Sequence, residues 1–309
     1  CQFVTRLRLW EGARAGEPFR LHDFQRAILR RIYGPSTPDG RRLIRVAAIW
    51  APRGFAKTTL SSALGLAHFM GPEAEAGGQV VIAAADRDNA GIGFNSAWQM
   101  VKQDDTLTER VRPIESRKLL RHATNRSTLK ALSTEAYSKH GLAASYFLAD
   151  EIHAWPPVEA RGLWKVVTDS MVKRTDPLTI IISTAGHGQG GLAWDLWDYS
   201  HKVAAGEIDD PTFAPIIFAA PPPTEATPPD WWQDEALWRQ VNPALDAGFC
   251  SIEEMRIKAK RVVHFPAEIA DFKRYHLNVW TEGAAEPWVS MATYDAADPM
   301  TDPEVFRHG

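Results

Sequence analysis

Hydrophobic positions along the chain follow two spacings, one typical of helices and one typical of buried strands. Apolar residues at helical spacing predict a helix over 21–33, which Gly34-Pro35 ends. From residue 43 onward, short apolar runs predict buried strands, and helical segments separate several of them. The predicted strands are 43–50, 80–85, 127–132, 144–149 and 178–184, and the predicted helices between them are 60–70 and 90–102.

Strands that alternate with helices favour the α/β class, with a mainly parallel sheet flanked by helices on both faces. The composition changes after about Ala219, where proline clusters at 221–223 and 228–229 indicate an irregular linker. Beyond it, helices are predicted over 231–240, 252–261 and 266–275. We therefore predict a sheet-based core over 1–219, a small helical lid subdomain over 220–282 and a linker over 283–309.

Composition and charge exclude several classes of protein. The chain has 309 residues and a net charge of -3, so it is not a wholly basic nucleic-acid binder, and DNA contact would need a local basic patch. Two cysteines do not indicate a disulfide framework. No apolar run reaches the ~18–20 residues of a membrane span, so no membrane association is expected.

A phosphate-binding loop is predicted between the first strand and the helix after it. P-loops follow the pattern G-x-x-x-x-G-K-[ST], and here Ala51 and Ala56 stand at the glycine positions. Lys57 would reach the β- and γ-phosphates of ATP and Thr58 would bind Mg²⁺, while the loop cradles the phosphates. Alanine fits if its φ is negative, and a positive φ would strain it. The predicted nucleotide-binding residues of the loop are Pro52, Arg53, Gly54, Phe55, Ala56, Lys57, Thr58 and Thr59.

Two carboxylates follow the predicted strand 144–149. Asp150 is placed to hold Mg²⁺ through water, and Glu151 to orient the attacking water. About ninety residues separate the two motifs, which leaves room for one strand between them in the sheet, and segment 127–132 is our candidate. This arrangement is typical of the additional-strand, catalytic-glutamate class of P-loop ATPases. Taken singly, the loop could be an ordinary strand-to-helix turn and the carboxylates an ordinary acidic cap.

Other polar residues fall at neighbouring strand ends. Ser183 and Thr184 end the strand 178–184, where ligands bind in open α/β sheets, and their hydroxyls could sense the γ-phosphate. A turn without a role is the alternative. His153 follows the acidic pair, and we expect it to hold the loop there rather than to bind a metal, since no Cys or second His lies at zinc-ligand spacing.

Together these segments resemble one family, the large subunit of the terminases of tailed bacteriophages, which are DNA-packaging motors. The resemblance covers roughly residues 19–295, and its motifs are specific in combination. They are Phe24-Gln25, Asp39-Gly40-Arg41-Arg42, Pro52-Arg53-x-x-x-Lys57-Thr58, Asp150-Glu151-Ile152-His153 with Trp155, Ser183-Thr184-Ala185-Gly186, and Arg274-Tyr275-His276-Leu277-Asn278-Val279-Trp280.

The resemblance implies residue roles. Gln25 would contact adenine, Arg53, Lys57 and Glu151 would be catalytic, and Ser183 and Thr184 would couple hydrolysis to the helical subdomain. Two positions depart from the family. Ala56 replaces the usual glycine, and Lys139-His140 precede Gly141, where some terminases carry an arginine finger. The trans-acting positive group could therefore be Lys139, Arg126 or Arg53.

The resemblance also implies partners. ATP and Mg²⁺ would drive double-stranded DNA into a procapsid. The motor would be a homo-oligomeric ring on the portal protein, with a small terminase subunit, in the cytoplasm of the infected bacterial host, although an isolated ATPase fragment could be monomeric. The family's nuclease domain would begin near 290–295, and Asp295, Asp298 and Asp302 in the tail are better explained as part of a solvated linker. No nuclease activity is expected from this chain.

A basic stretch between Ser116 and Thr134 lacks any acidic residue. Such a patch can bind DNA phosphates of any sequence, although a solvated loop or a subunit interface would look the same. Two other functions stay open. A helicase would need a second RecA-like domain, and a non-catalytic DNA-binding or assembly module would explain the lost P-loop glycines. The candidate DNA-binding residues are Arg117, Lys118, Arg121 and Arg126.

Overall fold

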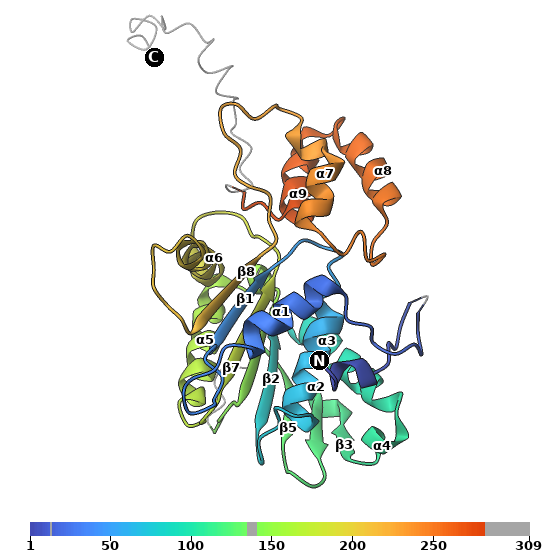
Figure 1. The fold of residues 1–309 in the computed structure, drawn as a ribbon, viewed down its shortest axis with the longest axis vertical. Coiled ribbons are helices and arrows are strands. Elements are labelled where there is room, and N and C mark those ends of the chain that lie inside the picture. The colour runs from blue at the N-terminus through green and yellow to red at the C-terminus, as the bar shows by residue number, and fades with distance from the viewer. Residues whose placement is uncertain (13, 135–140, 282–309) are drawn as a thin grey trace, which may run out of the picture.

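The computed structural model describes residues 1–12, 14–134 and 141–281. Within them, a single eight-stranded sheet runs in the order β3-β4-β5-β2-β6-β7-β1-β8 (Figure 1). The strands are β1 (Val46–Trp50), β2 (Gln79–Ala84), β3 (Val111–Ile114), β4 (Leu119–His122), β5 (Thr128–Ser133), β6 (Tyr146–Asp150), β7 (Leu178–Ser183) and β8 (Phe213–Ile217).

Nine α-helices lie in the described part of the chain. They are α1 (Asp23–Tyr33), α2 (Lys57–Met70), α3 (Arg87–Lys102), α4 (Asp105–Thr108), α5 (Pro157–Met171), α6 (Gly191–Ala204), α7 (Glu235–Val241), α8 (Ile252–Val262) and α9 (Pro266–Leu277). None of the described helices is both long and apolar enough to span a bilayer.

Six neighbouring strands, from β5 to β8, are parallel, whereas β4 pairs antiparallel with both of its neighbours, β3 and β5. Helices cover both faces: α1, α2 and α3 lie on one side, and α5 and α6 on the other (Figure 1). Strand β1 shows why both faces need cover. Ala47 and Ile49 pack into one hydrophobic core, whereas Ala48 and Trp50 pack into the other.

Helices α7, α8 and α9 have a third hydrophobic core of their own, which includes Trp232, Trp238 and Phe272. Side-chain caps begin two of these helices: Asp234 accepts a hydrogen bond from Ala236 N and Ser251 accepts one from Glu254 N. This helical cluster lies beyond the carboxyl ends of the strands (Figure 1).

The α/β class, the mainly parallel sheet and the predicted elements are confirmed, with shifts of up to four residues at their ends. The sequence analysis missed β3, β4, β8, α4, α5 and α6. The prediction that segment 127–132 lies between the P-loop strand and the acidic strand was wrong, because β7 lies there. Strand β5 pairs with antiparallel β4 on its outer side, so it cannot enter the middle of the sheet.

Candidate active site

The loop of residues 51–56 connects β1 to α2 and is anchored by its aromatic residue. Phe55 is buried, with its ring centre 5.0 Å from that of Phe24 in α1 and 4.8 Å from that of Phe218 after β8. Pro52 is buried, and Thr58 and Thr59 are half-buried in the first turn of α2. The free backbone N–H groups of that turn favour an anion at this point.

Two residues of the loop adopt left-handed conformations. Gly54 has φ 81°, and a Cβ atom added to it would lie 3.0 Å from Cys250. Ala56 has φ 59° and ψ 36°. Its φ is therefore positive, which is the strained alternative for alanine. For an L-residue with a side chain this conformation costs roughly 1–2 kcal/mol. The P-loop backbone is thus retained although its second glycine is replaced.

Lys57 is the first residue of α2 and is almost completely buried. Its Nζ donates to the carbonyl of Ala51 at 3.0 Å and to Thr184 Oγ1 at 2.5 Å, and lies 2.9 Å from Glu151 Oε1. The ammonium group therefore joins the carboxyl ends of β1, β6 and β7.

Glu151 follows β6 in a left-handed conformation, with φ 46°. Its Oε2 accepts from the Thr184 backbone N–H at 3.0 Å and lies 3.1 Å from His153 Nδ1. Burial alone would raise its pKa, but the charge of Lys57 and the hydrogen bond from His153 hold the pKa well below its usual range. Although 37% of this side chain is accessible, the carboxylate is thus held as an anion.

Asp150, the last residue of β6, is the other carboxylate. Burial, followed by the neighbouring Glu151 carboxylate, raises its pKa to about 7. When such a buried carboxyl group is ionised, a bound cation stabilises it, because the cation offsets both the cost of burial and the repulsion from Glu151. Asp150 is therefore a candidate ligand for a divalent cation, and the Thr58 hydroxyl at the start of α2 is a second candidate oxygen donor.

Ser183 and His153 complete the site. Ser183 Oγ lies 3.0 Å from His153 Nδ1 and donates to the carbonyl of Thr184 at 2.9 Å. The structure thus brings Thr184 against Lys57 and Glu151, and Ser183 against His153. Sequence reasoning expected only a loop-holding role for His153 and missed its contact with the Glu151 carboxylate. Its position two residues after Glu151 was the available signal.

Arg53 and Gln25 lie outside this cluster. The Arg53 guanidinium stacks 3.5 Å from the ring centre of Tyr275 in α9, and its backbone N–H donates to the Tyr275 carbonyl at 2.8 Å. Gln25 is fully buried; its Oε1 accepts from His22 N, and its Nε2 is a buried donor with no partner among the described residues. An unpaired amide donor beside the loop suits a base, but its role stays a prediction.

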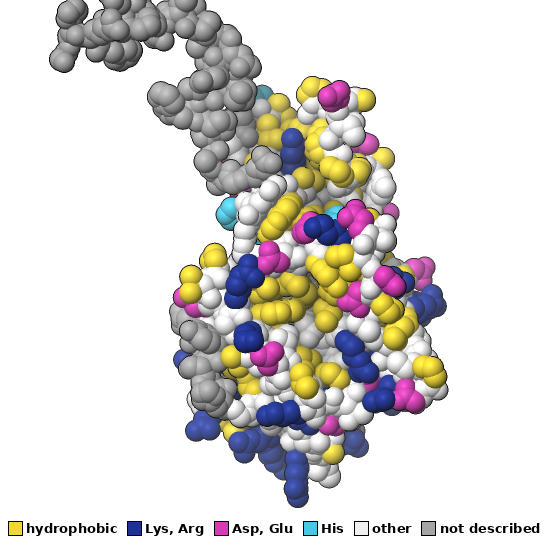
Figure 2. Space-filling model, turned by 90° about the vertical axis from the view of Figure 1, so that its left-hand side faces the viewer, with side chains coloured by type: hydrophobic (Ala, Val, Ile, Leu, Met, Phe, Trp, Pro, Cys, Tyr) yellow, Lys and Arg dark blue, Asp and Glu magenta, His cyan; other side chains and the backbone are white. Residues whose placement is uncertain are grey.

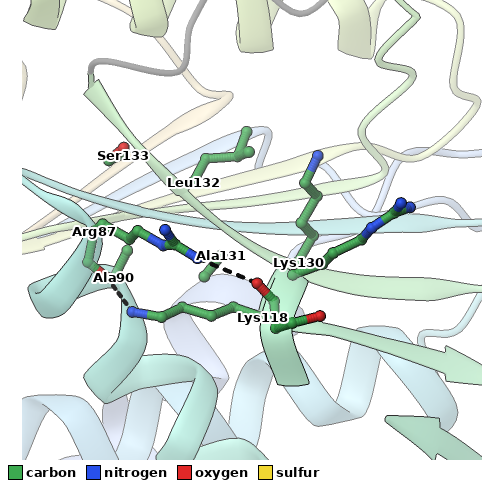
Figure 3. A pocket seen from close by; sticks show the side chains of 9 residues that line it. Arg87, Ala90, Lys118, Lys130, Ala131, Leu132 and Ser133 are labelled. Carbon is green, nitrogen blue, oxygen red and sulfur yellow. Dashed lines mark hydrogen bonds between the residues drawn. The ribbon is translucent and has the colours of Figure 1, made fainter. Parts of the chain in front are cut away.

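The four candidate DNA-binding residues lie at different points along the hairpin of β4 and β5, and their role in binding DNA stays a prediction. Arg117 and Lys118 line a cavity of about 480 Å³ together with Arg87 and Lys130 (Figure 3). Lys118 lies opposite Ala131 in β5, whereas Arg126 precedes β5, roughly 16 Å away along the strand. Arg121 is exposed on β4, between these two ends. The β-hairpin turn between β4 and β5 thus brings the two ends of the basic stretch together at the cavity and leaves Arg126 at the far end of the two strands.

This cavity lies at the same edge of the sheet as the loop of residues 51–56, because β5, β2 and β1 end at that edge. Lys118 donates to the carbonyl of Arg87, and Arg87 donates to that of Ser116. Figure 2 shows further Lys and Arg side chains at the end of the molecule opposite α7–α9. Charge alone therefore does not single out the cavity; its place at the active-site edge does.

Three expectations concern residues outside the described ones. Residues 135–140 include Lys139, the candidate trans-acting group. Residues 282–309 include the predicted linker over 283–309 and the aspartates Asp295, Asp298 and Asp302.

Comparison with known proteins identifies the family. The model of the terminase large subunit ATPase domain matches residues 23–202, more than half of the chain. The chain belongs to this terminase family. The large terminase subunit of Enterobacteria phage HK97 is 27% identical over 294 residues, which are 94% of this chain and 54% of that protein. The chain thus spans about half the length of this relative.

Solved terminase structures agree with this assignment. The HK97 bacteriophage large terminase superposes with a TM-score of 0.75 at 27% identity, over 90% of this chain and 54% of that one. The large terminase ATPase domain of Thermus phage P74-26 gives 0.53 at 17% identity, over 84% of this chain and all of that one. The second likeness concerns the fold alone. This member of the terminase family therefore keeps the family fold although alanine replaces the P-loop glycine at position 56.

Replacing Ala56 by glycine tests the strain in the terminase P-loop. The change relieves roughly 1–2 kcal/mol of left-handed strain and costs roughly 0.5–1 kcal/mol of chain entropy, so the free energy of unfolding should stay equal or rise by up to about 1.5 kcal/mol. The control Ala270→Gly, at an exposed position inside α9, should lose about 1 kcal/mol. Urea unfolding measures both. Equal losses in the two variants would contradict a strained Ala56.

The raised pKa of Asp150 predicts a pH-dependent cost to stability. Its folded pKa of about 7 lies above the unfolded value of 3.8, so the stabilisation it gives at low pH is lost as the pH rises from about 4 to about 7. With EDTA present, Asp150→Asn should match the wild type near pH 4 and exceed it at pH 8, by on the order of a few kcal/mol. A difference independent of pH in urea unfolding would contradict the raised pKa.

Proposed function

We propose that this chain is the ATP-hydrolysing motor domain of a terminase that translocates double-stranded DNA into a procapsid. One observation carries the proposal: Lys57 Nζ lies 2.9 Å from Glu151 Oε1, and both touch Thr184 at the edge of a terminase ATPase fold. Phosphoryl transfer needs a lysine that binds the phosphates and a carboxylate that orients the attacking water. Here the Thr184 hydroxyl lies between these two groups.

ATP would place its phosphates over the loop of residues 51–56 and the start of α2. The Lys57 ammonium group would then leave the Glu151 carboxylate and bind phosphate oxygens instead, because both are anionic acceptors for the same donor. Thr58 and Asp150 would hold Mg²⁺, which, when bound, neutralises phosphate charge. The unpaired Gln25 amide supports the adenine contact implied by the family.

Glu151 would orient the attacking water. A carboxylate with a strongly lowered pKa is a weak base, so Glu151 in its pair with Lys57 is poorly suited to accept a proton. Transfer of Lys57 to the phosphates would remove the main charge that lowers this pKa. The substrate would thereby raise the basicity of the group that acts on the water.

Ser183 and Thr184 would pass the loss of the γ-phosphate onward. Thr184 contacts Lys57 through Oγ1 and Glu151 through its backbone N–H, so it shares both groups that handle the phosphate. Ser183 contacts His153, which contacts Glu151. A change at the phosphate end would therefore reposition the loop after β7.

DNA would contact the basic cavity at the active-site edge. Among the described residues, Arg87, Arg117 and Lys118 form no ion pair with a carboxylate, so their charges are open to phosphate. Binding through phosphates is independent of sequence, as a packaging motor requires. We extend the proposal to a homo-oligomeric ring on the portal protein, aided by a small terminase subunit, in the cytoplasm of the infected bacterial host.

Removing the Glu151 carboxylate tests the hydrolytic role. Glu151→Gln should lower ATP turnover by roughly 100-fold or more, since positioned general bases contribute that much, and should leave nucleotide affinity within a few-fold. Steady-state hydrolysis with and without double-stranded DNA, and equilibrium binding of ATP, measure the two effects.

The control is Glu109→Gln at an exposed position after α4, which should keep full turnover. Undiminished turnover in Glu151→Gln would contradict the proposed role. A wild type that binds DNA but neither binds nor hydrolyses ATP would favour the non-catalytic module instead.

Removing cavity charges tests the DNA contact. Arg117→Ala should weaken binding to double-stranded DNA of any sequence and reduce the slope of log K against log salt by about one. Arg126→Ala removes the same charge at the other end of β5 and should have the smaller effect. Fluorescence anisotropy at several salt concentrations measures both. Equal effects would mean that the cavity is not the preferred contact.

A further inference from the structure

The segment 277–281 crosses the carboxyl ends of three neighbouring strands. The Leu277 carbonyl accepts from Ala220 N, beyond β8. After β7, Thr281 exchanges backbone hydrogen bonds with Gly186 and Gly188, at 3.3 and 2.8 Å. Just before the segment, Tyr275 holds Arg53 beyond β1. Because β7, β1 and β8 are adjacent, the end of α9 contacts all three loops at once.

Asn278 is the buried centre of this contact. Its Oδ1 accepts from the Ala185 backbone N–H at 2.6 Å, and its Nδ2 donates to the Phe218 carbonyl at 2.8 Å. The residue is fully buried and ends α9 in a left-handed conformation, with φ 56°. Its amide thus ties the loop after β7 and the loop after β8 to the helical cluster.

The contact with Ala185 continues directly from the active site. Ala185 is the next residue after Thr184, whose backbone N–H and hydroxyl both lie against the Glu151 carboxylate. A change in the partners of Glu151 moves Thr184, and the Ala185 N–H moves with it across one peptide plane. Asn278 is the first residue of the helical cluster that this displacement reaches.

Neighbouring packing leaves this loop little room to move alone. A Cβ atom added to Gly186 would lie 2.9 Å from Trp280, and Trp280 packs against Trp50, Trp194 and Trp197. Trp280 Nε1 also donates to the Gly188 carbonyl at 2.8 Å. The loop after β7 and the end of α9 therefore shift together rather than slide past each other.

We propose that Asn278 is the positioning residue that transmits the state of the nucleotide from the loop after β7 to helices α7–α9. This inference rests on the proposed ATPase function and names the residue on the helical side that receives the signal. Transmission needs a side chain that accepts from the Ala185 N–H, and a residue that tolerates a left-handed backbone. Asparagine meets both requirements.

Three substitutions separate these requirements. Asn278→Gly keeps the left-handed backbone and removes both hydrogen bonds. Asn278→Asp keeps the acceptor for the Ala185 N–H and tolerates the backbone. Asp234→Ala removes the cap of α7 and serves as a control that loosens the same helical cluster without touching the loop after β7.

Amide hydrogen exchange with a non-hydrolysable ATP analogue, compared with ADP, reports the transmission. In the wild type, exchange should differ between the two nucleotides both in 184–188 and in α7–α9. In Asn278→Gly, the difference should persist in 184–188 and vanish from α7–α9, and DNA-stimulated turnover should fall about tenfold while KM for ATP changes less than threefold. Asn278→Asp and Asp234→Ala should keep the difference in α7–α9.

A difference in α7–α9 that survives in Asn278→Gly would overturn the proposal, as would its loss in Asp234→Ala. If Asn278→Gly does not fold, Asn278→Ser, whose shorter side chain cannot span both partners, replaces it with the same expectation. A wild type that responds to the analogue without hydrolysing ATP would refute the proposed function, whereas a hydrolysing wild type whose α7–α9 do not respond would refute this inference alone.

Discussion

The ion pair between Lys57 and Glu151 depends on the position of β7 between β1 and β6. Parallel pairing sets Trp50 of β1 level with Ser183 of β7, and Asp150 of β6 level with Ile182. The residues that follow each strand therefore emerge at one edge of the sheet. Strand β7 separates the P-loop strand β1 from the acidic strand β6. Thr184, which follows β7, contacts both Lys57 and Glu151. Without β7, the lysine and the glutamate would lack the backbone N–H and hydroxyl that hold them.

Much of this arrangement could be predicted from the sequence, because it rests on local patterns. Buried strands followed by Lys57, by Asp150 and Glu151, and by Ser183 and Thr184 indicate an edge of polar residues whatever the exact topology. The order of the strands could not be predicted. Segment 127–132 and strand β7 are both short apolar runs, and only pairing with antiparallel β4 sends β5 to the outer half of the sheet.

The contacts of the helical cluster with the site were also beyond sequence reasoning. Arg53 belongs to a recognisable motif, but nothing local predicts that its guanidinium stacks on Tyr275 rather than pointing into the loop. Asn278 looks like an ordinary helix end, because its partners Ala185 and Phe218 lie 93 and 60 residues away. Periodicity reports which face of a helix is buried, whereas long-range polar pairs depend on how separate elements meet.

Backbone strain gives an independent view of the same site. Among the described residues, five without the freedom of glycine have positive φ: Ala56, Lys118, Arg126, Glu151 and Asn278. Ala56 directly precedes Lys57, and Glu151 contacts the Lys57 ammonium group. Asn278 ends α9, and Lys118 lines the basic cavity. Such conformations cost on the order of 1–3 kcal/mol each and persist only where the surroundings enforce them. Their concentration along one edge of the sheet indicates that this edge is shaped by what it binds and moves rather than by stability alone.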